Sequence, residues 1–250
     1  MSTYGILCAT PEELDAVRGR LNMAVAPQTH GPTQVWADGD VVLAQCGIGK
    51  VNAAAAATLL LSAYGATTLI FSGVAGGLDP DLEVGTVLLA ERLAIHDYGY
   101  VAGGRFTPTA SGIIPIGAPT LAEPPALSAD VVANLQRLAE VARPRLTHPI
   151  RLGGVVTADY FLNCAATRKD LRATFGADAI DMESGAVGQV ADAWGAPLYV
   201  IRTLSDLAGE DSHVTYPQMV GMASENSAVC VPELLTILRA MKRSPRPARN

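Results

Sequence analysis

The sequence predicts an α/β protein with a mostly parallel or mixed central sheet flanked by helices. Strand-like and helix-like segments alternate along the whole of the 250 residues, which is the order typical of this fold class. The strand-like segments are short and apolar, whereas several helix-like segments are rich in Ala and other small residues. No repeat, heptad pattern or internal linker interrupts the alternation. We therefore expect one domain over residues 1–241, followed by a disordered tail at 242–250.

The amino-terminal part of the chain predicts a strand, a helix, a hairpin, a second helix and a second buried strand. TYGILCA at 3–9 is typical of a short buried strand, and Pro11 begins a helix that ends near Leu21. A turn at residues 38–40 separates two strand-like runs and predicts the hairpin. An Ala/Leu-rich helix begins near Lys50 and ends at Gly65, and the buried strand follows at 68–74.

Residues 51–78 contain no charged side chain, and on length alone they could cross a bilayer. Four glycines interrupt this stretch: Gly65, Gly73, Gly76 and Gly77. Its composition also changes midway, from Ala and Leu to β-branched and aromatic residues. These features favour a helix followed by a strand of a parallel sheet, so we expect no membrane span.

The rest of the chain begins with an extended strand over residues 85–100. Residues 101–127 hold many Gly, Pro, Thr and Ser and predict a long loop, which in a compact domain is usually functional or mobile. The elements then alternate again: helix 128–142, strand 150–158, helix 165–176, strand 177–182, helix 183–195, strand 197–206 and helix 215–240. Ligands of such folds collect at the carboxyl ends of the strands, so the residues there are the candidates for a site.

Composition and charge exclude several classes of function. The net charge is −6 and the basic residues are spread out except near the carboxyl end, so we expect no nucleic-acid partner. The four cysteines have no paired spacing, and the four histidines have no ligand spacing with them. We therefore expect buried free thiols in a reducing compartment and no metal site. The amino-terminal residues show no export signal, which predicts a cytoplasmic protein.

Two glycine-rich segments raise the question of a nucleotide site. CGIGKVNA at 46–53 departs from a phosphate-binding loop because Val51 stands where Ser or Thr is needed, and Asn52 stands where a dinucleotide fingerprint needs Gly. Tight strand-to-helix turns use glycine in any case. SGVAGGL at 72–78 ends a buried strand and would let the backbone approach a ligand closely.

Carboxylates at three strand ends each allow two interpretations. Glu13 in CATPEEL can complete a capping box with Thr10, or it can be an active-site carboxylate. In IDMESGA an acid at the helix start is favoured by the helix dipole, but Glu183 could also accept hydrogen bonds from a sugar diol. Asp206 ends the strand that carries Arg202, and it can cap the next turn or donate a proton after partial desolvation. The residues alone leave these alternatives open.

Several segments together resemble one family, the 5′-methylthioadenosine/S-adenosylhomocysteine nucleosidases of the purine nucleoside phosphorylase superfamily. In the order found in that family they are GILCATPEEL, CGIGKVNAA, SGVAGGLDPDLEVGTVLLA, TADYFLN, IDMESGAVGQV and IRTLSDLAGEDS. The resemblance runs from about residue 4 to 240, with the 101–127 loop the least recognisable part. It implies a single-domain, three-layer phosphorylase-type fold with a central mixed sheet flanked by helices.

The resemblance also implies roles for individual residues. Asp206 would protonate N7 of the purine, with Ser205 orienting it. Glu13 would position and activate the attacking water, assisted by Arg202. The substrate-binding residues would be Glu183 on the ribose hydroxyls, Met182 beside the sugar, Phe161 stacked on adenine, Leu162 at the base edge, and Ile48, Ala75 and Gly76 along the pocket wall. Water would be the co-substrate, and no metal or organic cofactor is required.

The reaction that this implies is hydrolysis of the N-glycosidic bond of 5′-methylthioadenosine or S-adenosylhomocysteine, which releases adenine. One alternative is a phosphate-dependent nucleoside phosphorylase. No Arg lies between Arg20 and Arg92 to build an early phosphate pocket, and carboxylates on the first loop would repel the anion. A second alternative is a non-catalytic nucleoside-binding module, which the presence of all three carboxylates disfavours.

Some positions depart from the common pattern of the family. Asp181 stands where Glu is frequent, Val74 where Ser is often found, and Thr10 where many members have Met. Thr10 and Val74 would lie near the substrate, so the preference among 5′-substituents stays open. Family members are commonly homodimers in which a neighbour's loop closes the 5′ end of the pocket, and the 101–127 loop is the candidate here.

Overall fold

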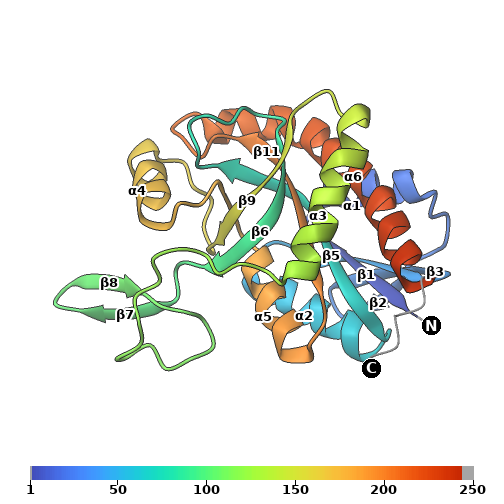
Figure 1. The fold of residues 1–250 in the computed structure, drawn as a ribbon, viewed down its shortest axis with the longest axis horizontal. Helices are drawn as coiled ribbons and strands as arrows, with labels where there is room; N and C mark the ends of the chain where they lie inside the picture. The colour runs from blue at the N-terminus through green and yellow to red at the C-terminus, as the bar shows by residue number, and fades with distance from the viewer. Residues whose placement is uncertain (1, 244–250) are drawn as a thin grey trace, which may run out of the picture.

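A nine-stranded mixed sheet forms the centre of the protein, whose computed structural model describes residues 2–243 (Figure 1). The strand order is β10-β9-β6-β11-β5-β1-β4-β3-β2. Parallel pairs at the centre join β11 (Leu198–Asp206), β5 (Ala66–Gly77), β1 (Thr3–Cys8) and β4 (Val41–Gln45). The carboxyl ends of these four strands therefore lie at one edge of the sheet. A site at this edge can be formed by the candidate residues that follow the strands.

The remaining strands make the sheet mixed. Between β11 and β9 lies β6 (Val87–Ile95), which is antiparallel to β11 and parallel to β9 (Ile150–Thr157). The short strand β10 (Ala179–Asp181) pairs parallel with β9 and antiparallel with the end of β5. At the other edge, β3 (Thr33–Asp38) and β4 form the predicted hairpin, and β2 (Gln28–His30) extends it.

Helices cover both faces of the sheet, which confirms the predicted three-layer architecture. One face carries α1 (Pro11–Leu21), α3 (Ala129–Ala142) and α6 (Ser212–Arg243), with the 3₁₀ turn η1 (Arg143–Arg145) after α3. The other face carries α2 (Lys50–Ser62) and α5 (Ser184–Trp194). Helix α4 (Ala165–Phe175) packs beside the edge formed by β9 and β10 (Figure 1).

The side chains of β1 show how the sheet builds two cores. Successive residues of a strand point to opposite faces, and here both faces are apolar. Tyr4 and Ile6 pack with residues of α1, α3 and α6, whereas Leu7 packs with residues of α2 and α5. A strand buried on both faces reads as a continuous apolar run rather than an alternating one, which is why the sequence identified it.

The helix ends follow the local signals in the sequence. Thr10 accepts a hydrogen bond from the backbone N–H of Glu13 and completes a capping box at the start of α1, with Pro11 in the first turn. Gly176 adopts a left-handed conformation at the end of α4, where glycine is favoured. Helix α6 begins earlier than predicted, at Ser212, and contains two internal prolines. It runs to Arg243, and residues 244–250 of the predicted tail lie outside the described residues.

The prediction of a long irregular loop at 101–127 is wrong at its start. Strands β7 (Gly99–Ala102) and β8 (Arg105–Pro108) form a separate hairpin, and the chain returns to the body by an irregular path. We call residues 99–120 the arm, because they project from the body of the molecule (Figure 1). A tight turn at Gly103 and Gly104, both with positive φ, closes the hairpin.

The structure also tests the expectations of buried thiols and of no membrane-spanning helix. Cys8, Cys46 and Cys230 are buried free thiols as predicted, but Cys164 is exposed, because it lies on a surface loop directly before α4. Within residues 2–243 no helix combines the length and the apolar composition needed to cross a bilayer. The helix and strand predicted over residues 51–78 are α2 and β5.

Candidate active site

A cavity of about 480 Å³ opens at the carboxyl ends of β1, β5, β10 and β11. Its walls contain every predicted site residue except Arg202. The complete set is Ala9, Thr10, Glu13, Ile48, Val74, Ala75, Gly76, Tyr160, Phe161, Leu162, Ile180, Asp181, Met182, Glu183, Ser205, Asp206, Ala208, His213 and Tyr216. Residues that are distant in the sequence therefore meet in one cavity at the sheet edge where the fold places ligands.

Glu13 satisfies both interpretations of the opening motif. One carboxylate oxygen, Oε2, accepts hydrogen bonds from the backbone N–H groups of Ala9 (2.7 Å) and Thr10 (3.1 Å), as a helix cap does. The other oxygen, Oε1, accepts from the N–H of Val74 at 2.9 Å. Burial raises the pKa of Glu13, although Arg202 and the backbone donors oppose this. Capping therefore holds the carboxylate in the cavity wall and does not turn it away.

Arg202 lies behind the cavity wall and not in it. Its side chain is fully buried, and its guanidinium stacks over the ring of Phe71 at 4.1 Å. Nη2 lies 2.7 Å from Asp181 Oδ2 and 3.4 Å from Glu183 Oε2. Nη1 lies 3.9 Å from Glu13 Oε1 and has no hydrogen-bond partner among the described atoms. One cation thus links three buried carboxylates, because an unpaired charge at this depth would be strongly destabilising.

Asp181 and Ser184 complete the surroundings of Arg202. The Ser184 hydroxyl accepts from Arg202 Nη2 at 2.9 Å, and Asp181 Oδ2 accepts from Nε at 2.9 Å. The Asp181 carboxylate also accepts from the backbone N–H of Ser184, so it is the acid at the start of α5. The helix-start interpretation of IDMESGA therefore applies to Asp181.

Glu183 lies in the cavity wall and does not cap the helix that it begins. It is the N-cap residue of α5, yet its side chain makes no capping hydrogen bond. Instead Oε1 accepts from the backbone N–H of Gly49 at 3.0 Å, and Oε2 faces Arg202. Burial, with smaller contributions from Asp181 and Glu13, raises the pKa of Glu183 to about 7, and Arg202 opposes this. The group is therefore partly protonated near neutral pH.

Asp206 occupies a separate position in the cavity wall. Oδ1 accepts from the backbone N–H of Ala208 at 2.8 Å, and Oδ2 accepts from the Ser205 hydroxyl at 3.0 Å. Ala208 has a φ of 50°, and this left-handed conformation turns the chain back toward the carboxylate. Burial raises the pKa of Asp206, while the hydrogen bonds from Ala208, Ser212 and Ser205 oppose the increase. A carboxyl group with a raised pKa is suited to donate a proton.

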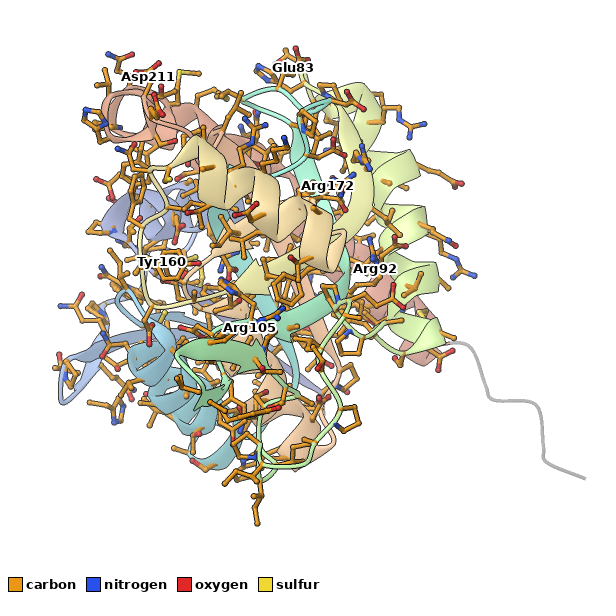
Figure 2. The ribbon with its side chains drawn as sticks, turned by 90° about the vertical axis from the view of Figure 1, so that its left-hand side faces the viewer. Glu83, Arg92, Arg105, Tyr160, Arg172 and Asp211 are labelled. Atoms are coloured by element: carbon orange, nitrogen blue, oxygen red, sulfur yellow. The ribbon has the colours of Figure 1, made fainter. Side chains whose placement is uncertain are left out.

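Aromatic side chains close one part of the cavity. Phe161 is 47% exposed and meets Tyr216 edge to face, with ring centroids 5.8 Å apart. Tyr160 lies beside it, and its hydroxyl is 3.0 Å from His96 Nε2. In Figure 2 Tyr160 lies on the face that the arm and α4 border. An exposed aromatic ring in a cavity wall provides an apolar surface against which a planar base can stack.

The sequence did not identify His213 and Tyr216 as cavity residues. Both lie in the first turns of α6, which the sequence analysis places at 215–240 and the structure begins at Ser212. His213 donates its backbone N–H to Asn163 Oδ1 at 3.2 Å, which ties this helix start to the loop after β9. No local motif marks these two residues, since they reach the cavity through tertiary packing.

No group of three His, Cys, Asp or Glu side chains within residues 2–243 is arranged as a metal site. The carboxylates of the cavity are instead committed to Arg202 or to backbone N–H groups. That the reaction requires no cofactor stays a prediction.

The fold and the site define a three-layer α/β enzyme scaffold with a carboxylate-rich cavity, and comparison with known proteins identifies it. The sequence matches the phosphorylase superfamily over residues 3–238. It is 38% identical to the 5′-methylthioadenosine/S-adenosylhomocysteine nucleosidase of Mycobacterium tuberculosis, over 95% of this chain and 98% of the relative. The chain therefore belongs to the 5′-methylthioadenosine/S-adenosylhomocysteine nucleosidase family of that superfamily.

Two other proteins extend the comparison. The aminodeoxyfutalosine nucleosidase of Campylobacter jejuni is 34% identical over 76% of this chain and 77% of its own length. The solved structure of a nucleosidase from Colwellia psychrerythraea in complex with adenine superposes with a TM-score of 0.81 at 28% identity, covering 95% of this chain and 96% of that one.

Proposed function

We propose that the protein is a hydrolase that cleaves the N-glycosidic bond of 5′-substituted adenosines, 5′-methylthioadenosine and S-adenosylhomocysteine among them, and releases adenine. The observation that carries this proposal is the presence of Asp206, a buried acid, in one cavity with two carboxylates paired to Arg202. Relatives of the same family carry this activity in their names. The reaction would serve nucleoside catabolism and methionine salvage.

Asp206 acts as the general acid in this mechanism. Cleavage of the bond between N9 and C1′ leaves negative charge on adenine and positive charge on the ribosyl ring. A proton delivered from Asp206 to N7 neutralises the departing base, and general acid catalysis of this kind contributes roughly 10²–10⁴ in rate. Ser205 donates a hydrogen bond to Asp206 Oδ2 and so orients the carboxyl group.

Glu13 and Glu183 act on the ribosyl side. Glu13 positions a water molecule and accepts its proton as the oxygen attacks C1′, while the charge of both carboxylates stabilises the cationic ring. Glu183 accepts hydrogen bonds from the 2′- and 3′-hydroxyls. Arg202 does not touch the substrate, because it is fully buried behind these groups. It is a positioning residue that keeps the two carboxylates apart and ionisable.

The remaining cavity residues supply binding. Phe161 provides the ring on which adenine stacks, the backbone of Leu162 reads the edge of the base, and Met182 packs beside the sugar. Ile48, Ala75 and Gly76 complete the wall. Thr10 and Val74, which differ from the common family pattern, also line the cavity, and a series of methylthio, homocysteinyl, deoxy and futalosine-type substrates measures the preference that they set.

Phosphorolysis is the alternative reaction, and the composition of the cavity disfavours it. A phosphate nucleophile needs cationic donors at the attacking position. No Arg or Lys of the described residues contributes to the cavity wall, and Arg202 is already paired with three carboxylates. Glu13 would lie where phosphate should bind and would repel it.

The protein functions, we propose, as a cytoplasmic homodimer. The arm exposes apolar side chains, among them Ile114 and Ile116, each 80% exposed. Contiguous exposed apolar residues mark interaction sites. The arm also projects from the body of the molecule (Figure 1), so it could reach over a second subunit. The double variant Ile114→Asp/Ile116→Asp should elute as a monomer, measured by light scattering. An unchanged mass would contradict dimerisation through the arm.

The function is tested by following free base during incubation with methylthioadenosine, S-adenosylhomocysteine, 5′-deoxyadenosine, aminodeoxyfutalosine and inosine, with and without phosphate. We expect adenine release that does not depend on phosphate and little action on inosine. Release that requires phosphate would identify a phosphorylase. Binding of the nucleosides without any release of base would identify a non-catalytic module.

A further inference from the structure

Lys50, Asp97 and Asp159 form a polar junction next to the cavity, and none of the three belongs to its wall. Lys50 is the first residue of α2, Asp97 lies between β6 and the arm, and Asp159 follows β9. Lys50 Nζ lies 2.5 Å from Asp97 Oδ1 and 3.6 Å from Asp159 Oδ2. The Lys50 and Asp97 side chains are only 21% and 27% exposed, so solvent screens their attraction less than that of a surface pair.

Backbone hydrogen bonds extend this junction into the loop after β9. The N–H of Lys50 donates to Asp159 Oδ1 at 2.8 Å, and the N–H of Asp159 donates to Asp97 Oδ2 at 3.2 Å. The residue before Asp97 adds another contact, because His96 Nε2 lies 3.0 Å from the hydroxyl of Tyr160. Two consecutive residues at the root of the arm therefore hold two consecutive residues of this loop. Figure 2 shows Tyr160 on the same face as the arm, which carries Arg105.

The junction also connects the two halves of the proposed nucleoside site. Directly after Tyr160 come Phe161 and Leu162, to which adenine binding is assigned above. Directly before Lys50 comes Gly49, whose N–H donates to Glu183 Oε1 at 3.0 Å. Displacement of the start of α2 would therefore disturb the carboxylate on the ribose side, and displacement of Asp159 would disturb the aromatic residue on the base side.

The acid that protonates the base is independent of this junction. Asp206 is held by Ser205 and Ala208, and in the described contacts neither residue bonds to Lys50, Asp97 or Asp159. Loss of the junction should therefore weaken substrate binding and leave the chemical step nearly unchanged.

We propose that Lys50 and Asp97 are positioning residues, which fix the base-stacking loop and the Gly49–Glu183 contact in one arrangement and thereby set the affinity for the nucleoside. This rests on the proposed function. The ion pair keeps the cavity preorganised, so that less ordering of the loop opposes binding.

The test uses Asp97→Ala, Lys50→Met and the double variant, with methylthioadenosine as substrate and free adenine as a binding probe in calorimetry. Each single variant should raise KM and the Kd of adenine about tenfold while kcat changes less than about threefold, because uniform binding is lost. The double variant should be no weaker than the worse single variant, since both act through one contact. Lys50→Arg, which keeps the charge, should recover most of the affinity.

Asp40→Ala is the matched control. Asp40 pairs with Arg239, and their side chains are 40% and 42% exposed, respectively. Asp40 precedes β4, at the opposite end of that strand from the cavity. Its loss should leave KM and the adenine Kd unchanged. If Asp97→Ala lowers the melting temperature but leaves both affinities unchanged, the junction is only structural and the proposal is wrong. If the unmodified protein binds adenine but hydrolyses no nucleoside, the proposed function fails, and the adenine Kd values still decide the role of the junction.

Discussion

Glu13 Oε1 lies 3.9 Å from Arg202 Nη1, and neither side chain is more than 3% exposed. The same carboxylate caps α1 through its other oxygen. One side chain thus anchors the first helix to the first strand and presents a charge to the cavity. The helix start and the proposed water-binding group share their structural support, so a change at Glu13 should affect both stability and activity.

Glu13→Gln tests this double role against the neighbouring Glu12→Gln. Both carboxylate oxygens of Glu13 accept hydrogen bonds from backbone N–H groups. The amide of Glu13→Gln has only one acceptor oxygen, so it cannot accept all of these hydrogen bonds, and it cannot take a proton from water. We expect a loss of kcat of at least about 100-fold and a destabilisation of about 1–3 kcal/mol. Glu12 is exposed on the same turn, so its variant should retain activity and stability. Steady-state kinetics and urea unfolding measure both effects, and equal kinetics for the two variants would refute the role of Glu13.

Asp206→Asn should reduce kcat by about 10²–10⁴, because the amide cannot supply the proton, while the melting temperature stays close to that of the unmodified protein.

The pH profile of Ser205→Ala gives a sharper test of Asp206 as the acid. Catalysis needs protonated Asp206, so kcat/KM should fall as the pH rises through its pKa. Ser205→Ala removes a hydrogen bond that lowers this pKa, and the falling limb should therefore move to higher pH. A limb that stays in place would exclude Asp206 as the titrating acid.

Glu183 should make the stability of the protein depend on pH. Burial raises its pKa from 4.5 to about 7 on folding. A group whose pKa is raised in the folded state stabilises that state fully below the unfolded pKa, and it loses this contribution as the pH rises through the folded pKa. The free energy of unfolding of the unmodified protein should therefore fall more than that of Glu183→Gln as the pH rises from 4.5 to 7. Urea unfolding at several pH values gives the difference, which would be constant if Glu183 did not titrate in this range.

Gly73→Ala should disrupt the contact between Glu13 and Arg202. A Cβ at position 73 would overlap Glu13 Oε1 and Arg202 Nη1, and Arg202 is fully buried and cannot move aside. Overpacking of this kind costs about 1–3 kcal/mol, and we expect a marked loss of activity as well. Gly19→Ala is the control, because a Cβ there meets no atom within 4 Å on a helix, where Ala is favoured. The control should be as active as the unmodified protein and slightly more stable, as thermal unfolding would show.

Local chemistry made most of the elements predictable from the sequence. Thr10, Pro11 and Glu13 form the predicted capping box, and Gly176 ends α4 as its position indicates. The direction of β6 could not be inferred, because a strand's residues specify which faces are buried but not whether the neighbouring strand is parallel or antiparallel. The start of α6 was placed at residue 215, whereas the helix begins at Ser212.

The candidate site was predictable where a chemical type and a strand end coincide, as at Glu13, Glu183 and Asp206. How deeply each of these side chains is buried could not be predicted. Arg202 also lies near the carboxyl end of a strand, but its side chain points into the protein. Its three carboxylate partners come together only in the complete fold. Tyr216 and His213 have no signal of their own, since packing of α6 on the sheet brings them to the cavity.

Cys164 offers a practical route to these experiments. All four cysteines lie in the described part of the chain, and it alone is exposed. Hydrogen bonds from Thr167 lower the pKa of its thiol, which increases the fraction present as reactive thiolate. It lies two residues after Leu162, so a maleimide dye would attach at a single position beside the cavity. Its fluorescence would report nucleoside binding in real time without any engineered cysteine.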